Sequence, residues 1–313
     1  MSVRAETQPR AAAARARPTN TGSIAERHTA LAWALLAPSL ILVALVAFVP
    51  LFQTIGQSFT DARLASSRAV NVVGLRNYTD LLQDEAFRHS IWVTVLFTLL
   101  TVVFEFLLGM VIALVVNSNF KGRGPMRAAM LVPWAIPTVV SAQMWKWMYH
   151  DIYGVINDLL VNRLHILSAN VAWVADPATS IPAIAAVDIW KTTPFVALLL
   201  LAGLQVIPGD IYEAADVDGA NKVQQFLRLT LPLLRPAILV TLIFRTLDAL
   251  RVFDVFYVMF GNRQDTQTMA IYAQQNIVAF SDIGYGGAIS VAIFILIGIF
   301  VIAYVTFLKV ETT

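Results

Sequence analysis

The chain has 313 residues, of which 58% are hydrophobic and only 13% are charged, whereas an ordinary soluble domain has about 25% charged residues. A net charge of +2 is too small to favour nucleic-acid binding. The absence of cysteine excludes disulfides, thiolate catalysis and cysteine-based metal sites. The composition therefore predicts an integral protein of a lipid bilayer, with no nucleic-acid partner.

The N-terminal residues 1–30 are polar, basic and rich in alanine, a composition typical of a disordered tail. Residues 31–52 follow without a charged residue. A cleaved signal peptide has a shorter apolar core of about 7–15 residues. Residues 31–52 are therefore predicted to be a retained first membrane span.

Further apolar stretches are long enough to cross a bilayer as helices, which takes about 20 residues. They cover residues 91–116, 128–148, 181–206 and 288–308. A stretch at 233–260 has the same length but contains four charged residues, and we count it as the fifth of six spans. The sequence thus predicts an all-α fold, with a six-helix membrane domain at 31–309 and a short C-terminus at 310–313.

The orientation of these spans follows from lysine and arginine, which stay on the cytoplasmic side near span ends. These residues are twice as frequent in the tail, the second and fourth connections and the C-terminal end as in the remaining connections. Both termini and the fourth connection, residues 208–232, are therefore predicted to be cytoplasmic.

The fourth connection carries strong helix signals. Asp210 and Glu213 have the spacing of a capping box, which predicts a helix from residue 211. Gly219 is suited to the left-handed conformation that ends a helix. A second helical stretch is predicted at 221–231, before Pro232 marks the return to the membrane.

The same connection resembles the EAA loop of ABC importer permeases. That pattern is Glu-Ala-Ala, three residues, Gly, nine residues, an aliphatic residue, any residue, and then an aliphatic residue followed by Pro. This chain matches it at Glu213, Ala214, Ala215, Gly219, Leu229, Leu231 and Pro232. The resemblance implies a type I ABC importer permease fold. It also implies that a coupling helix fits a cleft of a separate ATPase through Glu213, Ala214, Ala215, Asp218 and Gly219.

Other segments resemble permeases for maltose, trehalose and related sugars, namely 73–78, 154–160, 190–195 and 244–254. One departure is Gly261-Asn262-Arg263, where many relatives have a Gly-Gly-Pro turn. The resemblance implies a second homologous permease as heterodimer partner, two ATPase subunits that bind ATP and Mg²⁺, and an extracytoplasmic solute-binding protein. It places the chain in a bacterial or archaeal cytoplasmic membrane, with no cofactor or catalytic site of its own.

Charged residues inside the spans must be partnered, because each costs roughly 2.5–3.5 kcal/mol near the bilayer centre. Spacing by three residues predicts the helical pairs Arg245 with Asp248, Arg251 with Asp254, and Asp188 with Lys191. These residues either form a self-satisfying ion-pair ladder or face the solute. Glu105 is interpreted as a packing partner for an arginine or a polar backbone group.

In maltose-type permeases, the helices on either side of the EAA loop contact the solute. This resemblance implies a substrate pathway formed by Asp188, Lys191, Thr192, Phe195, Arg245 and Asp248.

Two other functions remain possible from the residues alone. A secondary transporter also places polar residues near the membrane midplane, but the chain has no visible inverted repeat. A membrane enzyme could use Asp188 and Asp248 as paired acids. The four histidines are scattered, and no zinc-binding helix, nucleophile elbow or phosphate loop accompanies the acids.

Overall fold

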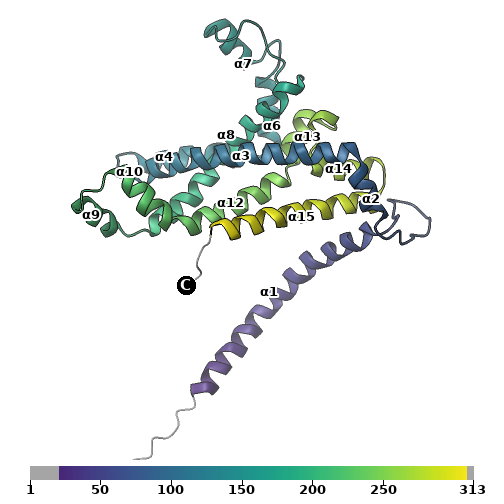
Figure 1. The fold of residues 1–313 in the computed structure, drawn as a ribbon, viewed down its shortest axis with the longest axis horizontal. Helices are drawn as coiled ribbons and strands as arrows, with labels where there is room; N and C mark the ends of the chain where they lie inside the picture. Colours follow the sequence, from purple (N-terminus) through teal and green to yellow (C-terminus); the bar gives the residue numbers. More distant parts are fainter. Residues whose placement is uncertain (1–20, 309–313) are drawn as a thin grey trace, which may run out of the picture. The chain divides into compact units, whose positions relative to one another are not determined.

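The structure is a computed structural model that describes residues 21–308 (Figure 1). Within this range the regular elements are helices, accompanied by isolated bridges between Thr60 and Val72 and between Arg63 and Asp282. The all-α fold class is thereby confirmed. The first helix begins at Thr21, inside the range 1–30 assigned to the tail, and residues 1–20 and 309–313 lie outside the described residues.

Four helices are long and apolar enough to cross a membrane singly. They are α1 (Thr21–Ser58), α3 (Glu85–Asn117), α8 (Pro177–Val206) and α15 (Ile283–Leu308). Two further pairs of helices have the length and composition of a span but are bent: Arg123–Ala135 is followed by Thr138–Met148 with a bend of 86°, and Lys222–Leu233 is followed by Arg235–Phe260 with a bend of 67°. Counting each bent pair as one span gives the six spans expected from the sequence.

The broken spans and the connections consist of shorter elements, labelled in Figure 1 where space allows. Those before α8 are α2 (Arg76–Gln83), α4 (Arg123–Met130), α5 (Val132–Ala135), α6 (Thr138–Met148), α7 (Val155–Asn157) and η1 (Asp158–Arg163). Those after α8 are α9 (Gly209–Val217), α10 (Lys222–Gln225), η2 (Phe226–Thr230), α11 (Leu231–Leu233), α12 (Arg235–Leu250), α13 (Asp254–Phe260), η3 (Gln264–Thr266), α14 (Met269–Gln274) and η4 (Gln275–Ala279).

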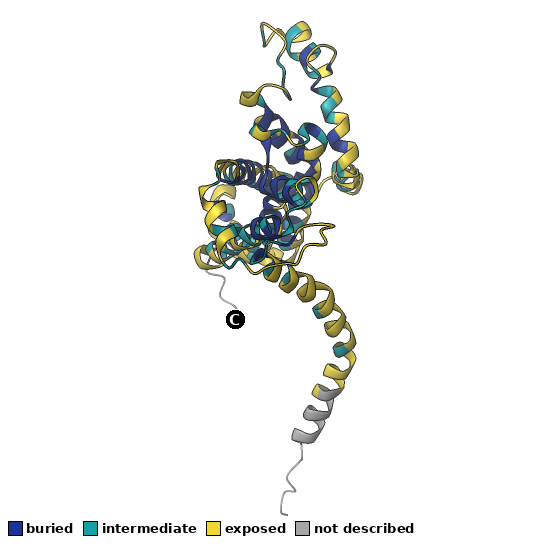
Figure 2. Ribbon diagram, turned by 90° about the vertical axis from the view of Figure 1, so that its right-hand side faces the viewer, coloured by how far each residue is buried: buried dark blue, intermediate teal, exposed yellow. Residues whose placement is uncertain are grey.

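The chain divides after Gln53 into two units, so α1 up to that residue is a body of its own. In the second unit α3 and α8 pack along each other most extensively, and α12 contacts both. Figure 2 shows the buried residues gathered in the interior of this unit. Close packing depends on small residues, as is usual between membrane helices: a Cβ added at Gly109 of α3 would lie 2.7 Å from Val196 Cγ1 of α8.

The family-like segment 154–160 has a structural role between α6 and α8. Asn157 is buried, and its Nδ2 donates to the carbonyls of Asp151 (3.0 Å) and Val171 (2.9 Å). Its Oδ1 accepts from Trp173 Nε1 at 2.8 Å. One side chain thus closes the loop on itself, which satisfies backbone groups that no regular element pairs.

Arg263, at the position where the family resemblance leads us to expect a turn proline, joins the residues after α13 to the start of α8. Its Nη1 donates to the carbonyl of Val174 and its Nη2 to Ser180 Oγ, each at 2.5 Å. Its Nε pairs with Asp265 Oδ1 at 2.6 Å. These contacts need a side chain with several N–H donors, which the expected proline does not have.

Candidate functional site

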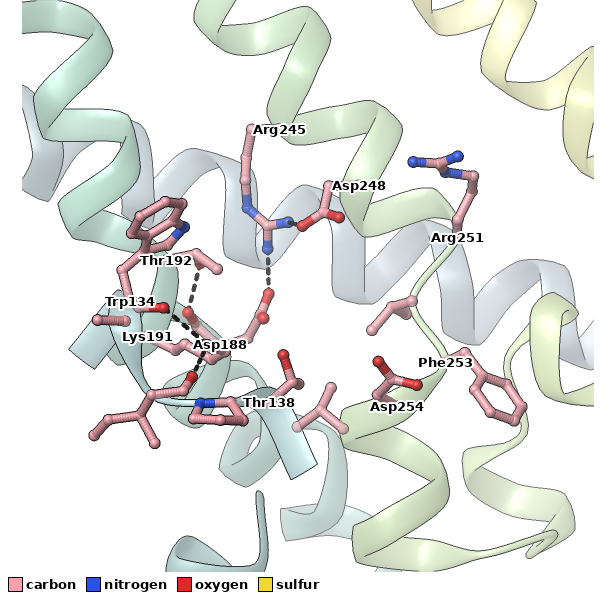
Figure 3. Close-up of a pocket in the computed structure, with 15 residues that line it drawn as sticks. Trp134, Thr138, Asp188, Lys191, Thr192, Arg245, Asp248, Arg251, Phe253 and Asp254 are labelled. Carbon is pink, nitrogen blue, oxygen red and sulfur yellow. Dashed lines mark hydrogen bonds and ion pairs between the residues drawn. The ribbon is translucent and has the colours of Figure 1, made fainter. Parts of the chain in front are cut away.

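A pocket of about 470 Å³ lies where two spans lose their helical structure (Figure 3). Residues 134–138 line it from the break between α5 and α6, and residues 251–255 line it from the break between α12 and α13. The helices α8 and α12 supply the remaining lining residues, which are Asp188, Lys191, Thr192, Arg245 and Asp248. Non-helical backbone at membrane depth is tolerated only where it is buried in protein or lines a cavity, so the breaks and the pocket belong together.

Arg245 is the centre of a charged network on the pocket wall. Its guanidinium pairs with Glu105 of α3, with Asp188 of α8 and, at 3.0 Å, with Asp248 of α12. Glu105 is fully buried and Arg245 is 3% exposed, whereas the Asp248 side chain is 69% exposed. Thr192 Oγ1 adds a hydrogen bond to Glu105. One arginine thereby joins three helices, and Asp248 is the most exposed carboxylate of the network.

The pairings expected from three-residue spacing are only partly correct. The pair of Arg245 with Asp248 is confirmed, as is the interpretation of Glu105 as the partner of an arginine. Asp188 pairs with Arg245 and not with Lys191, because the guanidinium of α12 lies nearer to it. Lys191 Nζ instead donates to the carbonyls of Ile136 (2.7 Å) and Trp134 (3.4 Å).

The expected pair of Arg251 with Asp254 is also wrong for the chain as described. Arg251 Nε donates to the carbonyl of Leu247 at 3.1 Å, and neither residue takes part in an ion pair within the described range. The physical reason is that α12 ends at Leu250 and α13 begins at Asp254. The helical spacing that would bring positions 251 and 254 together is lost at this break.

The pocket therefore brings together five of the six residues named for the substrate pathway, namely Asp188, Lys191, Thr192, Arg245 and Asp248. Phe195 is not among the lining residues but stacks on Trp134, which is, with 5.7 Å between ring centroids. Sequence reasoning missed Trp134 and Thr138, which line the pocket at the first break. Pro137 inside an apolar span was the available signal, since proline removes a helical hydrogen bond.

The loop between α8 and α12 begins with α9, which carries Glu213, Ala214 and Ala215. The capping box expected from Asp210 and Glu213 is absent, because the helix starts two residues earlier, at Gly209, with Pro208 at its N-cap. Its end is as expected: Gly219 has a φ of +75°. The amide of Ala220 donates to the carbonyl of Ala215 at 2.9 Å, and that of Gly219 to Asp216 at 3.1 Å, which is the Schellman arrangement.

The second half of the loop is held against α9 by side chains. Asn221 and Gln224 form a capping box at the start of α10, so the helix expected near residue 221 is present. Asp216 pairs with Lys222 at 2.9 Å. Hydrogen bonds from Lys222 and Gln225 hold the pKa of the Asp216 carboxyl below its ordinary value. Ala215 is buried in this turn, which leaves Glu213, Ala214, Val217 and Asp218 exposed.

The pocket and this loop lie in the part of the chain that matches a known family. Residues 105–309 match the family of binding-protein-dependent transport system inner membrane components. The chain belongs to this family. It is an inner-membrane transport subunit, a permease that works with a solute-binding protein.

Several relatives match the permease over most of its length. The sulfoquinovosyl glycerol transport system permease protein SmoG of Agrobacterium fabrum is 44% identical, covering 85% of this chain and 86% of the relative. The trehalose/maltose transport system permease protein MalF of Thermococcus litoralis is 41% identical, covering 91% and 95%.

The fold has a solved counterpart in a bacterial ABC transporter involved in the import of the acidic polysaccharide alginate. The TM-score is 0.76 at 23% identity, over 92% of this chain and 98% of that one. The type I ABC importer permease fold expected from the EAA-like loop is thereby confirmed.

Proposed function

We propose that this permease forms half of the translocation pathway of an ATP-driven importer of a neutral sugar, and that the charged pocket is its solute site. One observation carries the proposal: the pocket and the EAA-like loop share two helices. Asp188 and Lys191 lie on α8, which leads into the loop, and Arg245 and Asp248 lie on α12, which leads out of it. A movement of the loop is thus transmitted directly to the pocket wall.

The chemistry of the pocket suits a solute with many hydroxyl groups. Carboxylates accept hydrogen bonds from hydroxyls, ammonium and guanidinium groups donate to them, and both kinds line the pocket. The lining acids Asp188, Asp248 and Asp254 are matched by the cations Lys191, Arg245 and Arg251, and Glu105 adds a further acid behind the wall. Because no positive charge is in excess, we infer a neutral disaccharide such as trehalose or maltose.

The partners follow from the loop. We infer that Glu213, Ala214, Ala215, Asp218 and Gly219 dock into a separate ATPase, of which two copies bind ATP and Mg²⁺. A second, homologous permease completes the pathway as a heterodimer partner. The exposed residues Glu213, Ala214 and Val217 support this assignment, since they leave one side of α9 available to a partner.

Uptake by the reconstituted complex tests the sugar class. We expect labelled trehalose or maltose to enter proteoliposomes that contain both permeases, the ATPases and the binding protein, and ATP to be required inside. Unlabelled trehalose should compete, whereas sulfoquinovosyl glycerol, which is negatively charged, should not. Uptake without the ATPases would contradict the proposal and favour a secondary transporter.

The orientation is tested by reporter fusions. A reporter joined after Asn221, in the loop, is expected to be cytoplasmic, because lysine and arginine concentrate on that side. A reporter joined after Gly261, at the end of α13, is expected on the opposite side. Both reporters on one side would remove the fifth span and the proposed cytoplasmic termini with it.

A further inference from the structure

Lys191 has an environment unusual for a buried lysine. Lys191 is 8% exposed, and it forms no ion pair within the described chain. Its ammonium group donates to two backbone carbonyls, those of Ile136 and Trp134 (Figure 3). Asp188, one turn away on the same helix, is occupied by Arg245.

The two carbonyls lie where α5 ends and the third span bends by 86° into α6. The last carbonyls of a helix have no partner within that helix, and in a membrane each unsatisfied backbone group costs several kcal/mol. A cation at a helix C-terminus is favoured both by these carbonyls and by the helix dipole. Lys191 therefore stabilises the bend by capping the end of α5 from a different helix.

Lys191 also lines the pocket. An ammonium group has three N–H donors, and the carbonyls of Trp134 and Ile136 engage two of them. The remaining donor is available to a solute oxygen. A solute oxygen at this donor draws the ammonium toward the pocket, and the bond to the Trp134 carbonyl, at 3.4 Å the longer of the two, is the first to lengthen.

We propose that Lys191 is a positioning residue that couples occupancy of the pocket to the bend between α5 and α6. Without solute, the hydrogen bonds from Lys191 to the carbonyls of Trp134 and Ile136 hold the bend. With solute, these two hydrogen bonds weaken and the angle of the third span changes. The change reaches the fifth span, because α6 packs against α13, the helix that follows the break after α12. The inference rests on the proposed function, since it takes the pocket as the solute site.

The test compares Lys191→Met with Lys146→Met. Methionine keeps most of the apolar stem of lysine and removes the donors. Lys146 of α6 is a matched control, because it also donates to a carbonyl, that of Val258 at 3.0 Å, but it does not line the pocket. The angle is followed by spin labels at cysteines introduced for Met126 of α4 and Met144 of α6, both exposed, in a chain that has no other cysteine.

In the complete complex, trehalose-loaded binding protein is expected to shift the label distance of the unmodified permease and of Lys146→Met. In Lys191→Met the distance without solute is expected to be shifted or broadened already, with no further response to trehalose. Its ATP hydrolysis without solute should rise, and the stimulation by loaded binding protein should be lost. An unmodified distance and response in Lys191→Met would overturn the proposal.

The solute-free distance separates this inference from the assignment of the sugar, because it needs no solute. In one outcome, trehalose-loaded binding protein shifts the label distance in no variant while Lys191→Met still changes the solute-free distance. That result would reject trehalose as the solute and support the role of Lys191 in holding the bend. Should Lys191→Met fail to assemble, Lys191→Arg retains a cation for the carbonyls. We then expect an unchanged solute-free distance and a roughly tenfold higher KM for uptake, and an unchanged KM would contradict the proposal.

Discussion

Replacing Gly219 with valine is expected to abolish uptake while leaving the permease in the membrane. Gly219 has a φ of +75°, and a Cβ built there meets nothing within 4 Å. The cost is therefore in the backbone, because a β-branched residue is a strong outlier at positive φ. The Schellman turn that closes α9 opens, and Glu213 to Asp218 lose the arrangement in which we infer that they dock.

Gly219→Asn is the matched control, because asparagine tolerates the left-handed conformation and still adds a side chain. Uptake, solute-stimulated ATP hydrolysis and co-purification of the ATPases should be retained in Gly219→Asn and lost in Gly219→Val. Loss in both variants would show that position 219 must carry no side chain, whatever its backbone conformation. Normal stimulated hydrolysis in Gly219→Val would contradict the coupling role of this loop.

The parts that sequence reasoning predicted correctly depend on residues close together in the chain. Four of the spans follow from long apolar stretches, and the turn at Gly219 follows from one glycine after a short helix. Even here the start of α9 was misplaced, because Pro208 and Gly209 begin the helix before the acidic pair. Pro208 supplies a backbone conformation that outweighed the side-chain capping signal of Asp210 and Glu213.

The charged network could not be predicted from spacing, because its bonds join distant parts of the chain. Arg245 meets Glu105 across 140 positions and Asp188 across 57. The three-residue spacing predicted Lys191 as the partner of Asp188. The partner is Arg245 instead, because α12 packs against α3 and α8. The breaks that line the pocket were hidden for a related reason: hydropathy records that a stretch is apolar and not whether it is continuous.

Replacing Arg245 with methionine is expected to prevent assembly of the complex. The change leaves Glu105 and Asp188 buried without their cation, and removing one partner of a buried ion pair costs about 3–5 kcal/mol. Assembly is measured by co-purification with the second permease and by the thermal stability of the purified complex. Neutralising both acids as well, with Glu105→Gln and Asp188→Asn, should restore much of the lost assembly, since the uncompensated charge is the main cost.

Asp248→Asn is the contrasting variant in the same network. Its side chain is 69% exposed, and Arg245 keeps its two buried acids when Asp248 is neutralised. We therefore expect normal assembly, but a roughly tenfold higher KM for uptake, because a carboxylate that accepts from sugar hydroxyls is lost.

The double variant of Arg245→Met with Asp248→Asn should assemble as poorly as Arg245→Met, since it leaves Glu105 and Asp188 unpaired. Recovery of assembly in that double variant would show that Asp248 is the principal partner of Arg245, and unchanged transport by well-assembled Asp248→Asn would remove Asp248 from the solute site.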